Sequence, residues 1–234
     1  MTVAIWSDIS CPFCYMAKRQ FDSALAQFEH RDALNIEWKS FELAPGLETQ
    51  PDKNMNQFLA ERKGISIEET TAMGEQLAAS AKPLGLEYTM HTVIPVNTFK
   101  AHRILHLAKH AGLHGPAKER LFKAYFTEGK NIDDPTTLLA LGEEIGLARE
   151  EVAAIMESEQ FTDAVNADIQ EARQLGINSV PAFVFNGNKR VLGAQGSAAF
   201  LEALDQTFRE WSSSQPATTL SGEQGLSCEV GTEC

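Results

Sequence analysis

The feature that most constrains this chain is a strand-like segment leading straight into a Cys-x-x-Cys motif at the start of a helix. Residues 2–7 alternate in polarity and carry valine, isoleucine and tryptophan, as β-strands do. Cys11-Pro-Phe-Cys14 follows, and residues 34–38 alternate again. Between them, apolar residues recur at near-helical spacing: Met16, Phe21, Leu25 and Phe28. Strand, helix and strand within about forty residues predict a βαβ unit.

From Pro45 to Glu159 the apolar residues follow a helical period. Glycines come after most of these runs, as is usual at helix ends, and Asp134-Pro135 is a typical helix start. The helices predicted in this block are 54–63, 67–84, 98–111, 117–128, 135–145 and 149–157.

The last third of the chain predicts a helix over 161–175, a β-hairpin and a closing helix over 197–211. The hairpin is indicated by Asn186-Gly187-Asn188 between the apolar runs 181–185 and 189–192. Without the central block, the element order is β-α-β followed by α-β-β-α. This order predicts an α/β thioredoxin fold with an inserted all-helical domain. The predicted boundaries are 1–44 and 160–211 for the thioredoxin-fold domain, 45–159 for the helical insertion and 212–234 for a flexible tail with a cysteine pair.

The Cys-x-x-Cys motif predicts redox chemistry. Cys11 falls at the helix N-cap, and Pro12 falls at the first helical position, where its missing N–H costs nothing. Free N–H groups and the positive end of the helix dipole should lower the pKa of Cys11, which would then attack as a thiolate. Phe13 adds no charge, and Cys14, one turn on, is the expected resolving thiol. The alternative is that both cysteines are small apolar core residues.

Val180-Pro181 precedes the hairpin and has two interpretations. It is either an ordinary trans proline that opens an edge strand or a cis peptide beside the cysteine pair. In the second case the backbone of Val180 would be free to pair with a substrate chain. The residues alone favour trans, because only about 5–6% of X–Pro bonds are cis.

Four segments together resemble the DsbA-like thioredoxin family, and within it the FrnE-like cytoplasmic branch. They are Ser7-Asp-Ile-Ser-Cys-Pro-Phe-Cys14, Phe41-Glu-Leu-Ala-Pro45, Asn97-Thr-Phe-Lys-Ala-His-Arg103 and Gly176-Ile-Asn-Ser-Val-Pro-Ala-Phe183. The likeness spans residues 2–208. It implies a redox-active Cys11–Cys14 pair and a cis Pro181 packed against it. Related 2-hydroxychromene-2-carboxylate isomerases and kappa-class glutathione transferases usually have serine where Cys11 stands, so two cysteines favour disulfide exchange.

The resemblance also makes Asn97 and Arg103 candidates for substrate binding, since it places their helix opposite the cysteine pair. Arg103 would attract a carboxylate of a substrate or of glutathione. The alternative is that Asn97 or Thr98 caps the helix and Arg103 is a surface residue. His102, His106 and His110 share a helix face, but no carboxylate or cysteine joins them at a ligand-like offset, so no metal site is predicted.

The tail carries Cys228 and Cys234. FrnE-like proteins often have a C-terminal cysteine pair, although with four intervening residues instead of the five found here. These thiols are predicted to be accessory redox groups that exchange with the Cys11–Cys14 pair. The alternative is an incidental tail.

The net charge of −12 and the absence of a basic cluster argue against nucleic acid and membrane partners. With neither a signal-like N-terminus nor a membrane-length apolar run, the chain is expected to be cytoplasmic, as a monomer or homodimer. The leading hypothesis is a thiol–disulfide oxidoreductase or isomerase acting on protein or small-molecule disulfides. No bound cofactor is expected, although glutathione could be a co-substrate. The alternatives are a glutathione-dependent isomerase or transferase, and a binding module held by structural zinc.

Overall fold

The computed structural model describes residues 1–214 and is built on a four-stranded mixed sheet with the strand order β2-β1-β3-β4. β1 (Thr2–Ser7) lies parallel to β2 (Asn35–Ser40), and the crossover between them is α1 (Pro12–Gln27). β3 (Ala182–Phe185) is antiparallel to both β1 and β4 (Lys189–Leu192). The predicted βαβ unit and hairpin are therefore confirmed.

The hairpin turn forms because its two central residues accept left-handed backbone angles. Asn186 has φ 48° and Gly187 has φ 76°. Asparagine and glycine adopt this region at the lowest steric cost, and the resulting turn matches the twist of the two strands. The turn sets β3 in register with β1, so that Phe183 lies opposite Ile5.

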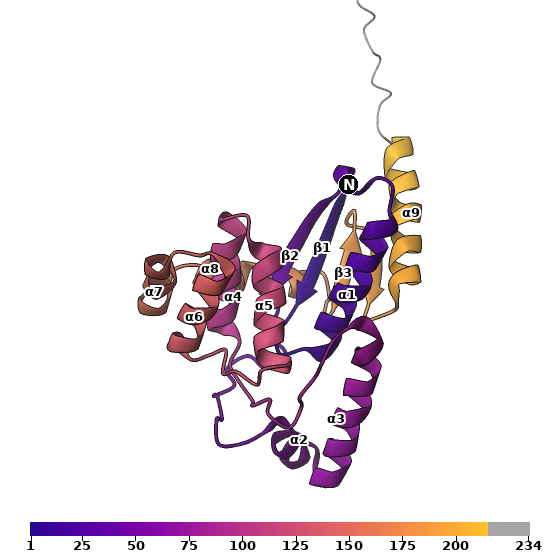
Figure 1. Ribbon diagram of the computed structural model, residues 1–234. Coiled ribbons are helices and arrows are strands. Elements are labelled where there is room, and N and C mark those ends of the chain that lie inside the picture. The colour runs from indigo at the N-terminus through magenta and orange to yellow at the C-terminus, as the bar shows by residue number, and fades with distance from the viewer. Residues whose placement is uncertain (215–234) are drawn as a thin grey trace, which may run out of the picture.

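Helices cover both faces of the sheet (Figure 1). α1 and α9 (Ser197–Ser214) pack together on one face, around a buried cluster that includes Phe21, Phe183 and Phe200. α8 (Thr162–Gln174) lies along β2 on the other face, where the Trp6 indole donates a hydrogen bond to the Asp168 carbonyl at 2.9 Å.

Six α-helices form the block between β2 and α8. They are α2 (Met55–Lys63), α3 (Ile67–Ala81), α4 (Phe99–His110), α5 (His114–Phe126), α6 (Pro135–Ile145) and α7 (Arg149–Glu157). Short 3₁₀ turns occupy Arg31–Ala33 and Lys82–Leu84. The predicted 67–84 helix ends as an α-helix at Ala81, because Pro83 cannot continue its hydrogen bonds. α5 begins three residues before its predicted start, with Pro116 in the first turn, where no N–H donor is needed.

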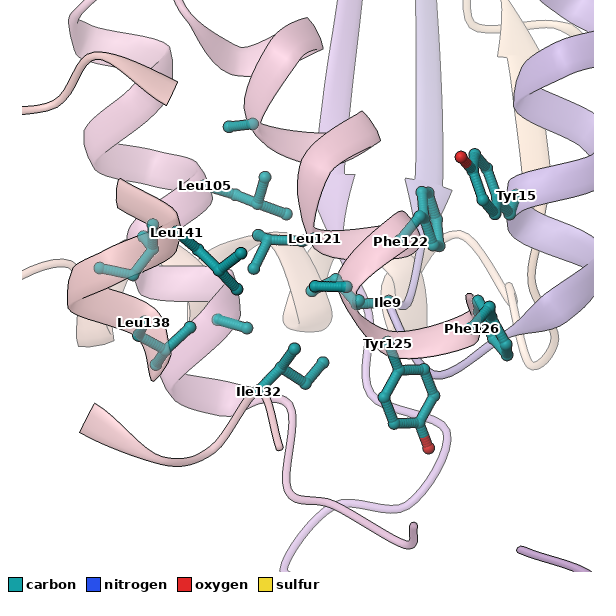
Figure 2. Close-up of a cluster of buried hydrophobic side chains, with 14 of the residues drawn as sticks. Ile9, Tyr15, Leu105, Leu121, Phe122, Tyr125, Phe126, Ile132, Leu138 and Leu141 are labelled. Atoms are coloured by element: carbon teal, nitrogen blue, oxygen red, sulfur yellow. The ribbon is translucent and has the colours of Figure 1, made fainter. Parts of the chain in front are cut away.

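The core of this block forms where α5 crosses α4 and α6 (Figure 2). Leu121 and Tyr125 of α5 belong to one buried cluster with Leu105, Leu138 and Leu141. The same cluster includes Cys11 and Cys14 and therefore joins the helical block to the start of α1. Among residues 1–214, no helix has the length and apolar character that crossing a membrane requires.

The packing of α6 on α7 depends on the small size of Gly142. A Cβ at this position would lie 2.7 Å from the Cγ2 atom of the buried Val152. We expect Gly142→Ala to lower the free energy of unfolding by about 1–3 kcal/mol, because a stiff valine on a packed helix cannot yield freely. Urea unfolding measures this change. Thr136→Ala, at an exposed site of α6, is the control and should stay within about 0.5 kcal/mol. An equal effect of both substitutions would contradict close packing at Gly142.

Candidate active site

The candidate site forms where β1 ends and α1 begins. Cys11 is the N-cap of α1 with extended backbone angles, and Pro12 is the first helical residue. The Cys11 N–H donates to the Asp8 carbonyl at 3.2 Å, and the Cys14 N–H donates to the Cys11 carbonyl at 3.1 Å. The strand therefore ends in a tight turn that places both cysteines at the amino end of the helix.

The Asp8 carboxylate holds this turn in place. Its oxygens accept hydrogen bonds from the Ser10 hydroxyl at 2.9 Å and the Leu43 N–H at 2.8 Å, and a weaker one from the Ser10 N–H at 3.3 Å. His102 Nε2 of α4 lies 3.3 Å from the same carboxylate, and both side chains are buried. Burial raises the pKa of Asp8, but the hydrogen bond and charge of His102, together with the hydrogen bonds from Leu43 and Ser10, outweigh it, so the net pKa lies below the ordinary value. Asp8 is therefore a buried anion three residues from Cys11.

Sequence reasoning missed this pair. Asp8 lies within the motif segment, yet nothing in the sequence connects it to a histidine 94 positions away. The available signal was an aspartate between the end of a predicted strand and the start of a predicted helix.

Both cysteines are free thiols with very little exposed surface, 2% for Cys11 and 1% for Cys14. The pKa of Cys11 is raised well above its ordinary value. The first cause is its hydrogen bond with the Cys14 side chain, followed by burial and by repulsion from charge on Cys14. The Cys14 N–H lowers this pKa, and the Asp8 charge raises it.

The prediction that the helix end lowers the pKa of Cys11 is therefore wrong for the buried, reduced cysteine pair. One helix terminus supplies too little positive potential to offset burial, a neighbouring thiol and a buried carboxylate together.

The proline loop lies directly against Cys11. The Val180–Pro181 peptide is cis, as the family resemblance implied. The Cys11 thiol lies 3.5 Å from the Val180 carbonyl oxygen and donates to it. The Pro181 carbonyl accepts from the Gly193 N–H at 2.8 Å, which anchors the loop to the end of the hairpin.

The two residues between the cysteines face the helical block. The Pro12 carbonyl accepts a hydrogen bond from the Tyr88 hydroxyl at 2.7 Å. The Phe13 side chain is 51% exposed and borders a cavity of about 280 Å³ between the start of α1 and helices α2 and α3. That cavity is mostly apolar, with Met73 and Leu77 among its walls.

Asn97 and Arg103 lie apart from the cysteine pair. The Asn97 side chain accepts from the Phe99 N–H at 2.9 Å, which ties down the start of α4. Arg103 is buried and donates to the carbonyls of Gln160 at 2.7 Å, Ile155 at 2.6 Å and Ser158. Arg103 therefore holds the end of α7. The alternative that Arg103 is a surface residue is wrong. Both residues border a wide cavity of about 710 Å³ whose walls include no residue of the Cys-x-x-Cys motif.

The three histidines of α4 have separate environments. His102 faces Asp8, His106 lies 3.1 Å from an Asp168 oxygen, and His110 packs on Phe161. No cluster of three or more potential metal ligands occurs in the stretch from residue 1 to 214. Cys228 and Cys234 lie outside the described residues.

A mixed four-stranded sheet with a Cys-x-x-Cys pair at the start of α1 and a cis proline beside it defines a thioredoxin-fold protein of the DsbA type. The sequence pattern of the DsbA-like thioredoxin domain matches residues 2–205. The chain belongs to the DsbA-like thioredoxin domain family, as its resemblance predicted, and the predicted fold class is confirmed.

Solved structures agree with this assignment. A probable DsbA oxidoreductase from Streptomyces coelicolor is 35% identical with a TM-score of 0.85, covering 98% of this chain and 99% of that one. A 2-hydroxychromene-2-carboxylate isomerase is 18% identical with a TM-score of 0.66, over 92% of this chain and all of the other. The cytosolic disulfide reductase DsbM from Pseudomonas aeruginosa, solved with GSH, is 18% identical with a TM-score of 0.61, over 89% and 100%. The last two show likeness of fold alone.

Replacing Asp8 by asparagine tests the role of its charge. We expect Asp8→Asn to lower the free energy of unfolding at pH 7 by about 2 kcal/mol, because several donors lose an anionic acceptor. The folded pKa of Asp8 lies below its ordinary value, so its contribution is complete above about pH 4 and is lost as the pH falls through the folded pKa. The difference between wild type and variant should therefore shrink in acid.

Urea unfolding at pH 7 and pH 3 measures both values. Asp22→Asn is the matched control, because the Asp22 side chain is exposed and its partner Lys18 keeps a second ion pair with Glu119, so the change should cost little. A gap between wild type and Asp8→Asn that stays constant with pH would contradict an ionised Asp8.

Proposed function

We propose that this protein is a thiol–disulfide oxidoreductase or isomerase in which Cys11 attacks a substrate disulfide and Cys14 resolves the mixed disulfide. One observation carries the proposal. Two free thiols lie one turn apart at the amino end of α1, and the sulfur of Cys11 contacts the carbonyl of the residue before a cis proline. This arrangement brings two sulfurs and an exposed loop edge together.

The chemistry follows from the order of the two cysteines. Cys11 loses its proton, and its sulfur forms a bond with one sulfur of the substrate disulfide while the other leaves as a thiolate. Cys14 then loses its proton and attacks the sulfur of Cys11, which releases the second substrate thiol. The two cysteines are oxidised by two electrons, and the substrate disulfide is reduced to two thiols. The reverse sequence oxidises a substrate dithiol.

Cys11 is assigned as the attacking thiol because of what lies around it. Its sulfur faces the 178–180 loop, where Asn178 and Ser179 are exposed and Val180 is half-buried. Cys14 is 1% exposed and is followed by Tyr15, whose ring stacks on Phe122 of α5. A substrate chain that displaces the Val180 carbonyl from the Cys11 thiol gains access to that sulfur first.

The raised pKa of Cys11 sets a condition on this reaction. Removing the first proton from the pair leaves one negative charge that both sulfurs and the Cys14 N–H share, whereas a second charge would be strongly opposed. The reactive form is therefore the singly ionised pair. Pairing of a substrate backbone with the proline loop would bring its disulfide to that charge.

We infer that glutathione is the small-molecule co-substrate. We also infer that the protein acts in the cytoplasm. The support is the fold likeness to a cytosolic disulfide reductase that was solved with GSH. The likeness to 2-hydroxychromene-2-carboxylate isomerase concerns the fold, and two cysteines at the helix start favour disulfide exchange over that chemistry.

The proposal predicts that Cys11→Ser abolishes insulin reduction and the reactivation of scrambled ribonuclease. Cys14→Ser should retain the first attack but stall as a mixed disulfide, because its resolving thiol is missing. Turbidity, ribonuclease activity and intact mass measure these outcomes. The matched control is Ser23→Ala, at an exposed position of α1, which leaves both sulfurs and the contacts of Asp8 in place and should keep activity.

Three results would contradict the proposal. One is equal activity of wild type and Cys11→Ser. Another is that Cys14 of the Cys11→Ser variant forms a mixed disulfide as fast as Cys11 of the Cys14→Ser variant does. The last is a wild type that is inactive in both disulfide assays but isomerises a glutathione adduct or forms a glutathione conjugate. That result would support the isomerase or transferase hypothesis.

A further inference from the structure

The mechanism above does not use the apolar cavity beside Phe13, which we call the α3 cavity. It holds about 280 Å³, and its walls include Ser10, Pro12 and Phe13 of the redox turn. Phe13 is 51% exposed and Met73, on the α3 side of the same cavity, is 46% exposed. Because Cys11 stands between Ser10 and Pro12 in the chain, a group attached to a sulfur bound at Cys11 comes close to this cavity.

The walls of the α3 cavity suit a neutral aromatic group. Met55, Met73 and Met90 contribute thioethers, and Phe13 and Phe126 contribute rings. Thioethers and ring edges both pack favourably on an aromatic group. None of the residues between 1 and 214 that border the cavity carries a charge. The carboxylates and ammonium group of glutathione would therefore find no charged partner there.

One polar group on this wall has an acceptor to spare. Asn56 of α2 is only 6% exposed, and its side-chain nitrogen donates to Thr71 Oγ1 at 3.2 Å. Its Oδ1 atom accepts no hydrogen bond from the described residues. The other two polar side chains on the wall are paired, since the Ser10 hydroxyl donates to Asp8 at 2.9 Å and the Thr70 hydroxyl to the Asn56 carbonyl at 2.9 Å. A ligand with a donor would satisfy Oδ1.

Gly74 keeps space open beside this oxygen. It lies in the middle of α3 and has no left-handed backbone angle, so its conformation does not require glycine, and alanine would favour the helix more. A Cβ at this position would lie 3.4 Å from Asn56 Oδ1 and 3.3 Å from Met90 Cβ. Gly74 also borders the α3 cavity. The missing Cβ therefore leaves room for a ligand atom next to the free acceptor.

We propose that the α3 cavity binds a tryptophan or tyrosine side chain next to the reacting cysteine of a polypeptide substrate, with its N–H or O–H donating to Asn56 Oδ1. This inference rests on the proposed function and names its substrate class. A cavity of roughly 150 Å³ is enough for benzene, so the α3 cavity has room for an indole or a phenol.

The surroundings of Cys11 favour a polypeptide over a free aromatic compound. The Cys11 sulfur contacts the Val180 carbonyl, and Asn178 and Ser179 before it are exposed. An extended backbone can pair with such a loop edge while a neighbouring side chain enters a pocket. The loop would hold the substrate backbone at Cys11, and the α3 cavity would select the side chain beside it.

The test compares side chains that differ in the donor alone. Acetylated and amidated tripeptides Xaa-Cys-Xaa carry tryptophan, benzothienylalanine or alanine at both outer positions, so that either direction of the chain presents the side chain. Benzothienylalanine has the shape of tryptophan but a sulfur atom in place of the N–H group. The peptide cysteine is activated as a mixed disulfide with thionitrobenzoate.

The reaction is followed with the reduced full-length protein, in which Cys228→Ser and Cys234→Ser remove the tail thiols. The Cys11 thiolate forms a bond with the sulfur of the peptide cysteine, and thionitrobenzoate leaves as a thiolate. Stopped-flow absorbance of thionitrobenzoate gives the second-order rate constant for each peptide.

We expect the tryptophan peptide to react about ten-fold faster than the benzothienylalanine peptide, because only tryptophan satisfies the buried acceptor. The alanine peptide should be the slowest of the three, because it buries no ring. Asn56→Leu removes the acceptor and Gly74→Ala covers it, so each should bring the first two rates close to equality. The matched control is Gly115→Ala of α5, where a Cβ meets no atom within 4 Å, and it should keep the ten-fold preference.

A further probe separates a polypeptide from a small aromatic substrate. It is the thionitrobenzoate disulfide of an indolylethyl thiol, which has the ring and the N–H group but no peptide backbone. We expect it to react no faster than the alanine peptide. A rate equal to that of the tryptophan peptide would overturn the proposal, because a free aromatic compound would then be the occupant.

Equal rates for tryptophan and benzothienylalanine in wild type, or a full preference in Asn56→Leu, would also overturn the proposal. The three peptides with wild type decide the matter if the variants do not fold. Failure of the proposed function is a distinct result, namely release of thionitrobenzoate from every peptide at the wild-type rate in Cys11→Ser.

Discussion

The carboxylate of Asp8 is the interaction on which the rest of this site depends. It joins the turn between β1 and α1 to the backbone at Leu43 and to the α4 residue His102, three parts of the chain that are far apart in sequence. These contacts fix where the first turn of α1 begins and therefore where the sulfur of Cys11 lies. The cysteine pair then meets the proline loop, whose Val180 carbonyl accepts from Cys11. The Asp8 contacts thus determine the geometry of the candidate site before any substrate binds.

The same carboxylate limits how much negative charge the site holds. The helix end favours a thiolate, but Asp8, burial and Cys14 all raise the pKa of Cys11. A thiol that retains its proton is a poorer leaving group than a stabilised thiolate, and its disulfide is a weaker oxidant. The electrostatics therefore favour a more reducing couple than the helix end alone would produce.

Local patterns in the sequence were enough to predict much of the fold. Asn186-Gly187 predicted the hairpin because its turn needs left-handed residues, and Cys11-Pro12 predicted the helix start because proline fits there. The cis bond at Pro181 came from family resemblance, since local sequence favours trans.

The features that the sequence did not predict depend on contacts between residues that are distant in sequence. The Asp8–His102 pair, the packing of Arg103 on the end of α7 and the burial of Lys118 arise when helices distant in sequence pack together. The sign of the Cys11 pKa change was wrong for the same reason, because burial is a tertiary property.

The reduction potential of the Cys11–Cys14 couple tests the account most directly. The protein is equilibrated in glutathione buffers of graded ratio and quenched in acid, and the state of each cysteine is read by mass spectrometry. The account predicts one reversible two-electron transition that joins Cys11 to Cys14, at a potential more reducing than the about −120 mV of DsbA. Cysteines that stay reduced or bind glutathione separately without closing a disulfide, or a couple as oxidising as DsbA, would contradict it.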